Sequence, residues 1–132
     1  TDGDVLIHFT KADVIHMGDT FFTMGSYPYV DLGSGGDATG IVSAADKGLA
    51  MCGPQTVIIP GHGPATDCAG LREWRNMVQT IVERVRAGMK KNQTLDQLKA
   101  AGLTKEYDDK FDKGFIRSPV FIESVYRSLG GK

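Results

Sequence analysis

Glycine residues divide this chain into short segments, and that division limits the possible folds more than any other feature of the sequence. The 17 glycines separate short runs of β-branched residues from longer stretches with helical spacing. Residues 4–9 and 13–17 are two such runs joined by three residues, which predicts an antiparallel hairpin. Residues 56–59 form a third run, which stops at Pro60. The hairpin strands are apolar on both faces, which is typical of a sheet covered on two sides.

Helical signals lie between and after these strands. Asp37 stands where an N-cap would begin a helix over residues 38–52. Residues 68–91 carry apolar side chains at helical spacing, which predicts a long amphipathic helix with Trp74 among its core-facing residues. The remaining helices are expected at residues 95–101 with Thr94 as the cap, at 106–113, and after Pro119.

The order of these elements is strand, strand, helix, strand and then helices, which predicts an α/β fold with a small mixed sheet. A length of 132 residues corresponds to one domain, so we expect residues 1–132 to form a single unit. Hydrophobic residues make up 41% of the chain, which argues against wholesale disorder. No apolar run approaches the ~20 residues of a membrane span, so no membrane association is expected.

Charge is distributed unevenly along the chain. Residues 1–66 hold seven acidic and two basic side chains, whereas the rest hold nine acidic and thirteen basic ones. We interpret the basic residues as solvated helix faces, because they alternate with acids. No basic run is interleaved with aromatic residues, so nucleic acid is not an expected partner.

The two cysteines, Cys52 and Cys68, lie at the ends of apolar segments. Two cysteines do not form a disulfide framework, and the chain has no C-x-x-C motif for a zinc ribbon or redox pair. We therefore interpret both as small buried residues.

Asp19 and His62 are the residues most suited to chemistry. Each follows an apolar strand, and His62 is flanked by Gly61 and Gly63, which leave room for an ion or substrate. Sites in α/β folds lie at the carboxyl ends of strands, so we expect these two side chains to meet there and to bind metal. The other histidines, His8 and His16, lie within strands and are interpreted as hydrogen-bonded core residues. Taken singly, Asp19 is better explained as a turn or cap residue and His62 as an exposed turn residue, and only their joint occurrence favours a shared site.

Residues 14–22, with their His-Met-Gly-Asp-Thr core, and residues 58–64, Ile-Ile-Pro-Gly-His-Gly-Pro, resemble the C-terminal half of the metallo-β-lactamase-fold hydrolases. The resemblance extends over nearly the whole chain. It implies half of an αββα sandwich. It also implies that Asp19 bridges two metal ions, usually zinc, and that His62 completes the shell of the second ion.

The resemblance also shows what this chain lacks. The H-x-H-x-D-H run of that family belongs to its N-terminal half and has no counterpart here. A further histidine ligand normally precedes a stretch like Thr1-Asp2-Gly3-Asp4, so we expect additional residues upstream of Thr1. Zinc binding by Asp19 and His62 alone is therefore expected to be weak or absent.

Two functions are compatible with the sequence. The chain is either the C-terminal part of a metal-dependent hydrolase, inactive by itself, or a non-catalytic half-domain that self-associates. In both cases half of the sandwich leaves one sheet face bare, and a second copy or the missing N-terminal half is expected to cover it. The substrate and the compartment are not determined by the sequence.

Overall fold

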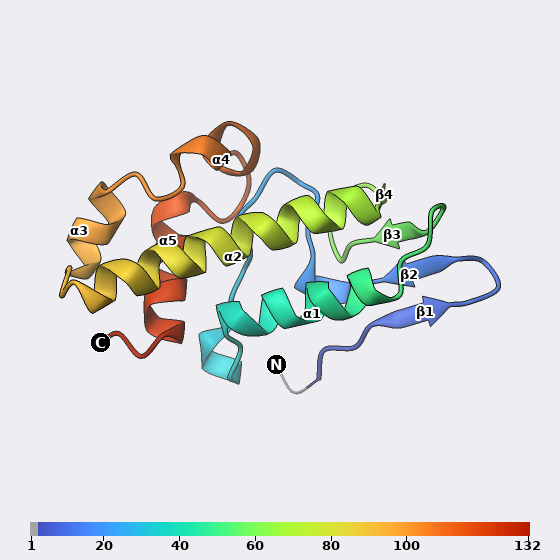
Figure 1. Cartoon of the computed structure of the whole chain (residues 1–132), viewed down its shortest axis with the longest axis horizontal. Coiled ribbons are helices and arrows are strands. Elements are labelled where there is room, and N and C mark those ends of the chain that lie inside the picture. The colour runs from blue at the N-terminus through green and yellow to red at the C-terminus, as the bar shows by residue number, and fades with distance from the viewer. Residues whose placement is uncertain (1–2) are drawn as a thin grey trace.

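The computed structural model describes residues 3–132 and has an α/β architecture with a small mixed sheet (Figure 1). Strand β1 (Ile7–Phe9) pairs antiparallel with β2 (Val14–His16), as the predicted hairpin requires. β2 pairs parallel with β3 (Val57–Ile59), and β3 pairs antiparallel with β4 (Thr66–Asp67). The sheet order is therefore β1-β2-β3-β4.

The two longest helices run side by side, and the strands gather near the end where α1 stops and α2 starts (Figure 1). Helix α1 (Ala38–Ala50) begins at Asp37, whose carboxylate accepts hydrogen bonds from the next turn, so the predicted cap is confirmed. Helix α2 (Cys68–Lys90) matches the predicted amphipathic helix within one residue. Trp74 on this helix is 2% exposed, as expected of a core residue.

Three short helices complete the C-terminal part. They are α3 (Leu95–Ala100), α4 (Lys105–Phe111) and α5 (Ser118–Ser128). Thr94 caps α3 through a reciprocal capping box, which confirms the cap predicted from the sequence. None of the helices within the described residues is long and apolar enough to cross a membrane.

The segment between β2 and α1, residues 17–37, is a loop with short helical turns. It contains two 3-10 turns, η1 (Gly18–Thr20) and η2 (Leu32–Ser34). Tyr27 is buried, and its hydroxyl donates a hydrogen bond of 2.7 Å to Asp108 on α4. Burial and the neighbouring Asp108 carboxylate raise the pKa of Tyr27. This buried tyrosine fixes the segment against the C-terminal helices.

The two faces of the sheet differ in their environment. Ile15 and Ile58 point to the same side and are fully buried in a core shared with α1 and α2. On the opposite side, Ile7, Phe9 and Val57 are 47%, 51% and 41% exposed. The helices therefore cover one face of the sheet, as expected from the sequence, and the other apolar face is uncovered in this chain by itself.

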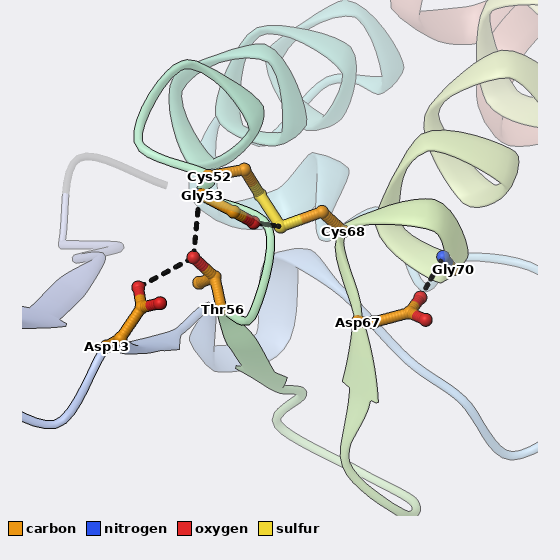
Figure 2. Close-up of a disulfide and its surroundings, with 7 residues drawn as sticks. All are labelled: Asp13, Cys52, Gly53, Thr56, Asp67, Cys68 and Gly70. Atoms are coloured by element: carbon orange, nitrogen blue, oxygen red, sulfur yellow. Dashed lines mark hydrogen bonds between the residues drawn. A yellow bond between two sulfur atoms is a disulfide. The ribbon is translucent and has the colours of Figure 1, made fainter.

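The interpretation of the two cysteines as separate buried residues is also wrong, because Cys52 and Cys68 form a disulfide (Figure 2). Cys52 lies two residues after the end of α1, Cys68 is the first residue of α2, and their Cα atoms lie 6.1 Å apart. The bond therefore joins the two helices where the chain leaves one and enters the other. Both cysteines are half-buried.

A hydrogen-bonded network lies beside the disulfide (Figure 2). The Thr56 hydroxyl donates to Asp13 at 2.6 Å and accepts from the Gly53 amide at 2.7 Å. Thr56 is buried, whereas Asp13 lies in the turn of the β1–β2 hairpin. The network thus ties the hairpin to the loop that leads from α1 into β3.

We expect reduction of the disulfide to lower the free energy of unfolding by about 3 kcal/mol, because the bond closes a loop of roughly 15 residues in the unfolded chain. Urea denaturation with and without a reductant measures this difference. The Cys52→Ala/Cys68→Ala double variant is the control, and reductant should not change its midpoint. An unchanged midpoint for the reduced parent chain would contradict the prediction.

Candidate functional site

Asp19 and His62 lie at the same edge of the sheet because of the strand directions. Asp19 is in the η1 turn, three residues after the end of β2, and His62 follows β3 by three residues. β2 and β3 are parallel neighbours, so their carboxyl ends coincide. This is the arrangement by which α/β sheets bring together side chains that are distant in sequence.

The two side chains are close to one another and open to solvent. His62 Nε2 lies 3.4 Å from Asp19 Oδ1, and the side chains are 58% and 68% exposed. The prediction that they approach each other is confirmed. Because both are well solvated, their mutual attraction contributes little to folding stability.

Backbone hydrogen bonds hold the two turns together beneath these side chains. The Gly61 amide donates to the carbonyl oxygens of Gly18 at 2.8 Å and Phe21 at 3.1 Å. The Thr23 amide donates to the His62 carbonyl at 3.0 Å. The close approach of these two turns requires glycine at position 61, because a Cβ there would overlap Asp19 Oδ1 and lie 2.7 Å from Gly18 O.

The other histidines do not join this pair. His16 is half-buried in β2, and its Nδ1 accepts a hydrogen bond of 3.1 Å from the Gly18 amide. The expected hydrogen bond is therefore present and supports the turn that carries Asp19, but His16 is not part of the buried core. His8 lies on β1, two strands away from β3.

The pair offers two of the donor types that zinc accepts, a carboxylate oxygen and an imidazole nitrogen. Across residues 3–132, however, no group of three or more histidine, cysteine or acidic side chains is placed to hold a metal ion. Zinc sites in proteins use three or four protein ligands. Asp19 and His62 therefore do not form a complete zinc site without ligands from elsewhere. Of the Thr1–Asp4 stretch, Thr1 and Asp2 lie outside the described residues.

A cleft of about 570 Å³ opens beside Asp19. Tyr29 lines the cleft and is half-exposed. Tyr27 and Phe22, by contrast, are buried. Asp37 also lines the cleft, and its hydrogen bond from Thr39 lowers the pKa of its carboxyl group.

Comparison of the chain with models of known protein families and with curated proteins finds no match. The resemblance seen in the sequence motifs therefore remains an expectation.

We expect Gly61→Ala to lower the free energy of unfolding by roughly 1–3 kcal/mol, because the added methyl group meets backbone atoms that have no room to move. It should also separate His62 from Asp19, which NMR of the His62 ring would detect. Gly3→Ala is the matched control, because a Cβ at Gly3 meets nothing within 4 Å. Equal stability of the two variants would show that the close approach at Gly61 is unimportant.

Proposed function

We propose that this chain is the C-terminal part of a zinc-type hydrolase with a metallo-β-lactamase-like αββα sandwich. The observation that carries the proposal is the exposed Asp19–His62 pair, with 3.4 Å between Nε2 and Oδ1, at the ends of two parallel strands. Neither side chain is needed to fill the core, so a structural role explains the pair poorly. Two solvated metal-type donors at a sheet edge are better explained as part of a ligand set.

In this proposal the chain's own residues position two ligands. The Gly61 amide fixes the separation of the two turns, and the His16–Gly18 contact supports the turn of Asp19. Zinc, when bound to a complete ligand set, supplies a nucleophilic hydroxide and stabilises the charge that develops on a carbonyl or phosphoryl oxygen. The ligands that this chain lacks would come from the N-terminal half.

The uncovered sheet face supports the same proposal. Ile7, Phe9 and Val57 form an apolar surface on the side opposite the helices. In a sandwich of two sheets, such a face packs against the apolar face of the other sheet. The second sheet would thus bury these side chains and bring its own ligands toward the same edge.

We expect the 132-residue chain to show no appreciable hydrolysis of ester, lactam or phosphodiester substrates, with or without added zinc. The reason is the incomplete ligand set, since loss of even one supporting partner typically costs ~10–100-fold in metal affinity or activity. Initial-rate assays with zinc-free and zinc-loaded protein provide the measurement. Zinc-dependent turnover that disappears in Asp19→Ala and His62→Ala would refute the expectation and would mean that a site forms between subunits.

Whether an N-terminal half supplies the missing ligands can be tested separately. The sequence encoded upstream of Thr1 is expected to contain an H-x-H-x-D-H run. An upstream sequence without such a run would contradict the hydrolase proposal, whatever the activity of the isolated chain.

A second candidate function is a non-catalytic half-domain that self-associates. The observation that favours it is the same uncovered face, because its most exposed side chains, Ile7, Phe9 and Val57, are apolar and uncharged. Two copies related by a twofold axis would present this face to each other without opposing charges. Each copy would then cover the sheet of the other.

If the sheet face mediates self-association, Phe9→Asp should convert a dimer into a monomer, because a carboxylate would be buried without a partner. Light scattering over a concentration series measures the mass. Phe115→Asp is the matched control, since Phe115 is 81% exposed and lies outside the sheet. A parent chain that stays monomeric would exclude self-association and leave the N-terminal half as the occupant of this face.

A further inference from the structure

We propose that the Cys52–Cys68 disulfide is a redox switch that controls how often the segment carrying His62 detaches from the sheet. The bond closes the loop of residues 52–68, which contains β3, β4 and His62. A dithiol reductant opens this loop and lets the segment move while the rest of the chain stays folded. The consequence for metal binding rests on the proposed hydrolase function, whereas the opening itself does not.

The segment between the two cysteines is held by few buried side chains. Within residues 53–67, only Thr56, Ile58 and Pro60 are buried, and most of the others are exposed. Its strands β3 and β4 contain three and two residues. Segments with so few buried contacts open locally before the whole chain unfolds. The disulfide restricts such opening, because it fixes both ends of the segment to each other.

The helices at the two ends of this segment are held together independently of the disulfide. Leu71, Trp74 and Val78 of α2 are at most 2% exposed, and they belong to the same core as Ala45 of α1. Opening of the loop therefore leaves the packing of α1 against α2 in place. The expected change on reduction is confined to residues 53–67.

The position of the disulfide favours its reduction in the folded chain. Both cysteines are half-buried, so a small reductant reaches them. Cys68 is the first residue of the 23-residue helix α2, where the partial positive charge of the helix N-terminus stabilises an anionic sulfur. The Asp67 carboxylate points away from the disulfide and accepts a hydrogen bond of 2.9 Å from the Gly70 amide (Figure 2). Cys68 is therefore the better leaving group of the two.

The reaction is thiol–disulfide exchange with a dithiol. A thiolate of the reductant attacks Sγ of Cys52, the Sγ–Sγ bond breaks, and Cys68 leaves with the bonding electron pair and then takes up a proton. The second thiol of the reductant attacks the mixed disulfide, which releases Cys52 as a thiol and the reductant as a cyclic disulfide. The protein gains two electrons and two protons, and the dithiol supplies both.

The opening reaches the Asp19–His62 pair through backbone hydrogen bonds at the two ends of β3. The Val57 amide donates to the Asp13 carbonyl at 3.0 Å, and the Gly61 amide donates to the η1 turn at 2.8 Å. When these bonds break, His62 moves away from Asp19. A metal site that uses both side chains would then lose one ligand, so reduction would weaken metal binding.

Native-state hydrogen exchange at low urea concentrations tests the proposal on the metal-free chain, oxidised or reduced with excess dithiothreitol. Reduction should speed exchange of the Val57 and Gly61 amides about a hundredfold, the factor that corresponds to closure of a loop of roughly 15 residues. This exchange should be nearly independent of urea, because a local opening exposes little surface. The Met77 and Val78 amides, buried in α2, should keep a strong dependence on urea, because they exchange by global unfolding.

The Cys52→Ala/Cys68→Ala variant is the matched control. It lacks the loop closure, so its Val57 and Gly61 amides should exchange at the fast, urea-independent rate with and without dithiothreitol. This control separates the effect of the disulfide from any other effect of the reductant.

Each of three outcomes would contradict the proposal. The disulfide stays oxidised in excess dithiothreitol without urea, or the reduced chain loses its fold altogether. In the third outcome, Val57 and Gly61 of the reduced chain show the same urea dependence as Met77, which means that the segment opens only with the whole chain. Local opening together with an upstream sequence that lacks the H-x-H-x-D-H run would retain the redox switch and reject only its effect on a metal site.

Discussion

The parallel pairing of β2 with β3 is the constraint on which the arrangement of the site depends. It places the turns after both strands at one edge of the sheet, and the Gly61 amide then joins them through the carbonyls of Gly18 and Phe21. The separation of Asp19 and His62 follows from these backbone contacts and not from attraction between the side chains. Because both side chains are exposed, they remain available to a ligand or to another polypeptide segment.

The opposite end of β3 is held by different interactions. The disulfide fixes the end of α1 to the start of α2, and the Thr56 network ties the chain entering β3 to the hairpin turn. β3 is therefore anchored at both ends, by side chains and a covalent bond at one and by backbone hydrogen bonds at the other. A strand of three residues would be a weak element without such supports. This anchoring gives a small sheet a defined edge on which a site can be built.

The uncovered face of the sheet connects the two candidate functions. An apolar surface formed by Ile7, Phe9 and Val57 is costly in water, and its burial would stabilise whichever assembly covers it. A second sheet would also add ligands to the Asp19–His62 pair, whereas a second copy would add only another such pair. Under the proposed hydrolase function, the covering partner would therefore decide whether this edge of the sheet gains a complete ligand set.

The sequence by itself determined the local structure: the hairpin, the caps of α1 and α3, the long helix and the burial of Trp74. These follow from interactions between residues a few positions apart, such as an N-cap carboxylate or an apolar stripe with helical spacing. Motif positions after two strands also predicted the meeting of Asp19 and His62. Only the tertiary structure decided the Cys52–Cys68 bond and the hydrogen bond of the buried Tyr27 hydroxyl to Asp108. Each of these depends on which distant segments pack together, and neither the spacing of residues nor the composition predicts such long-range packing.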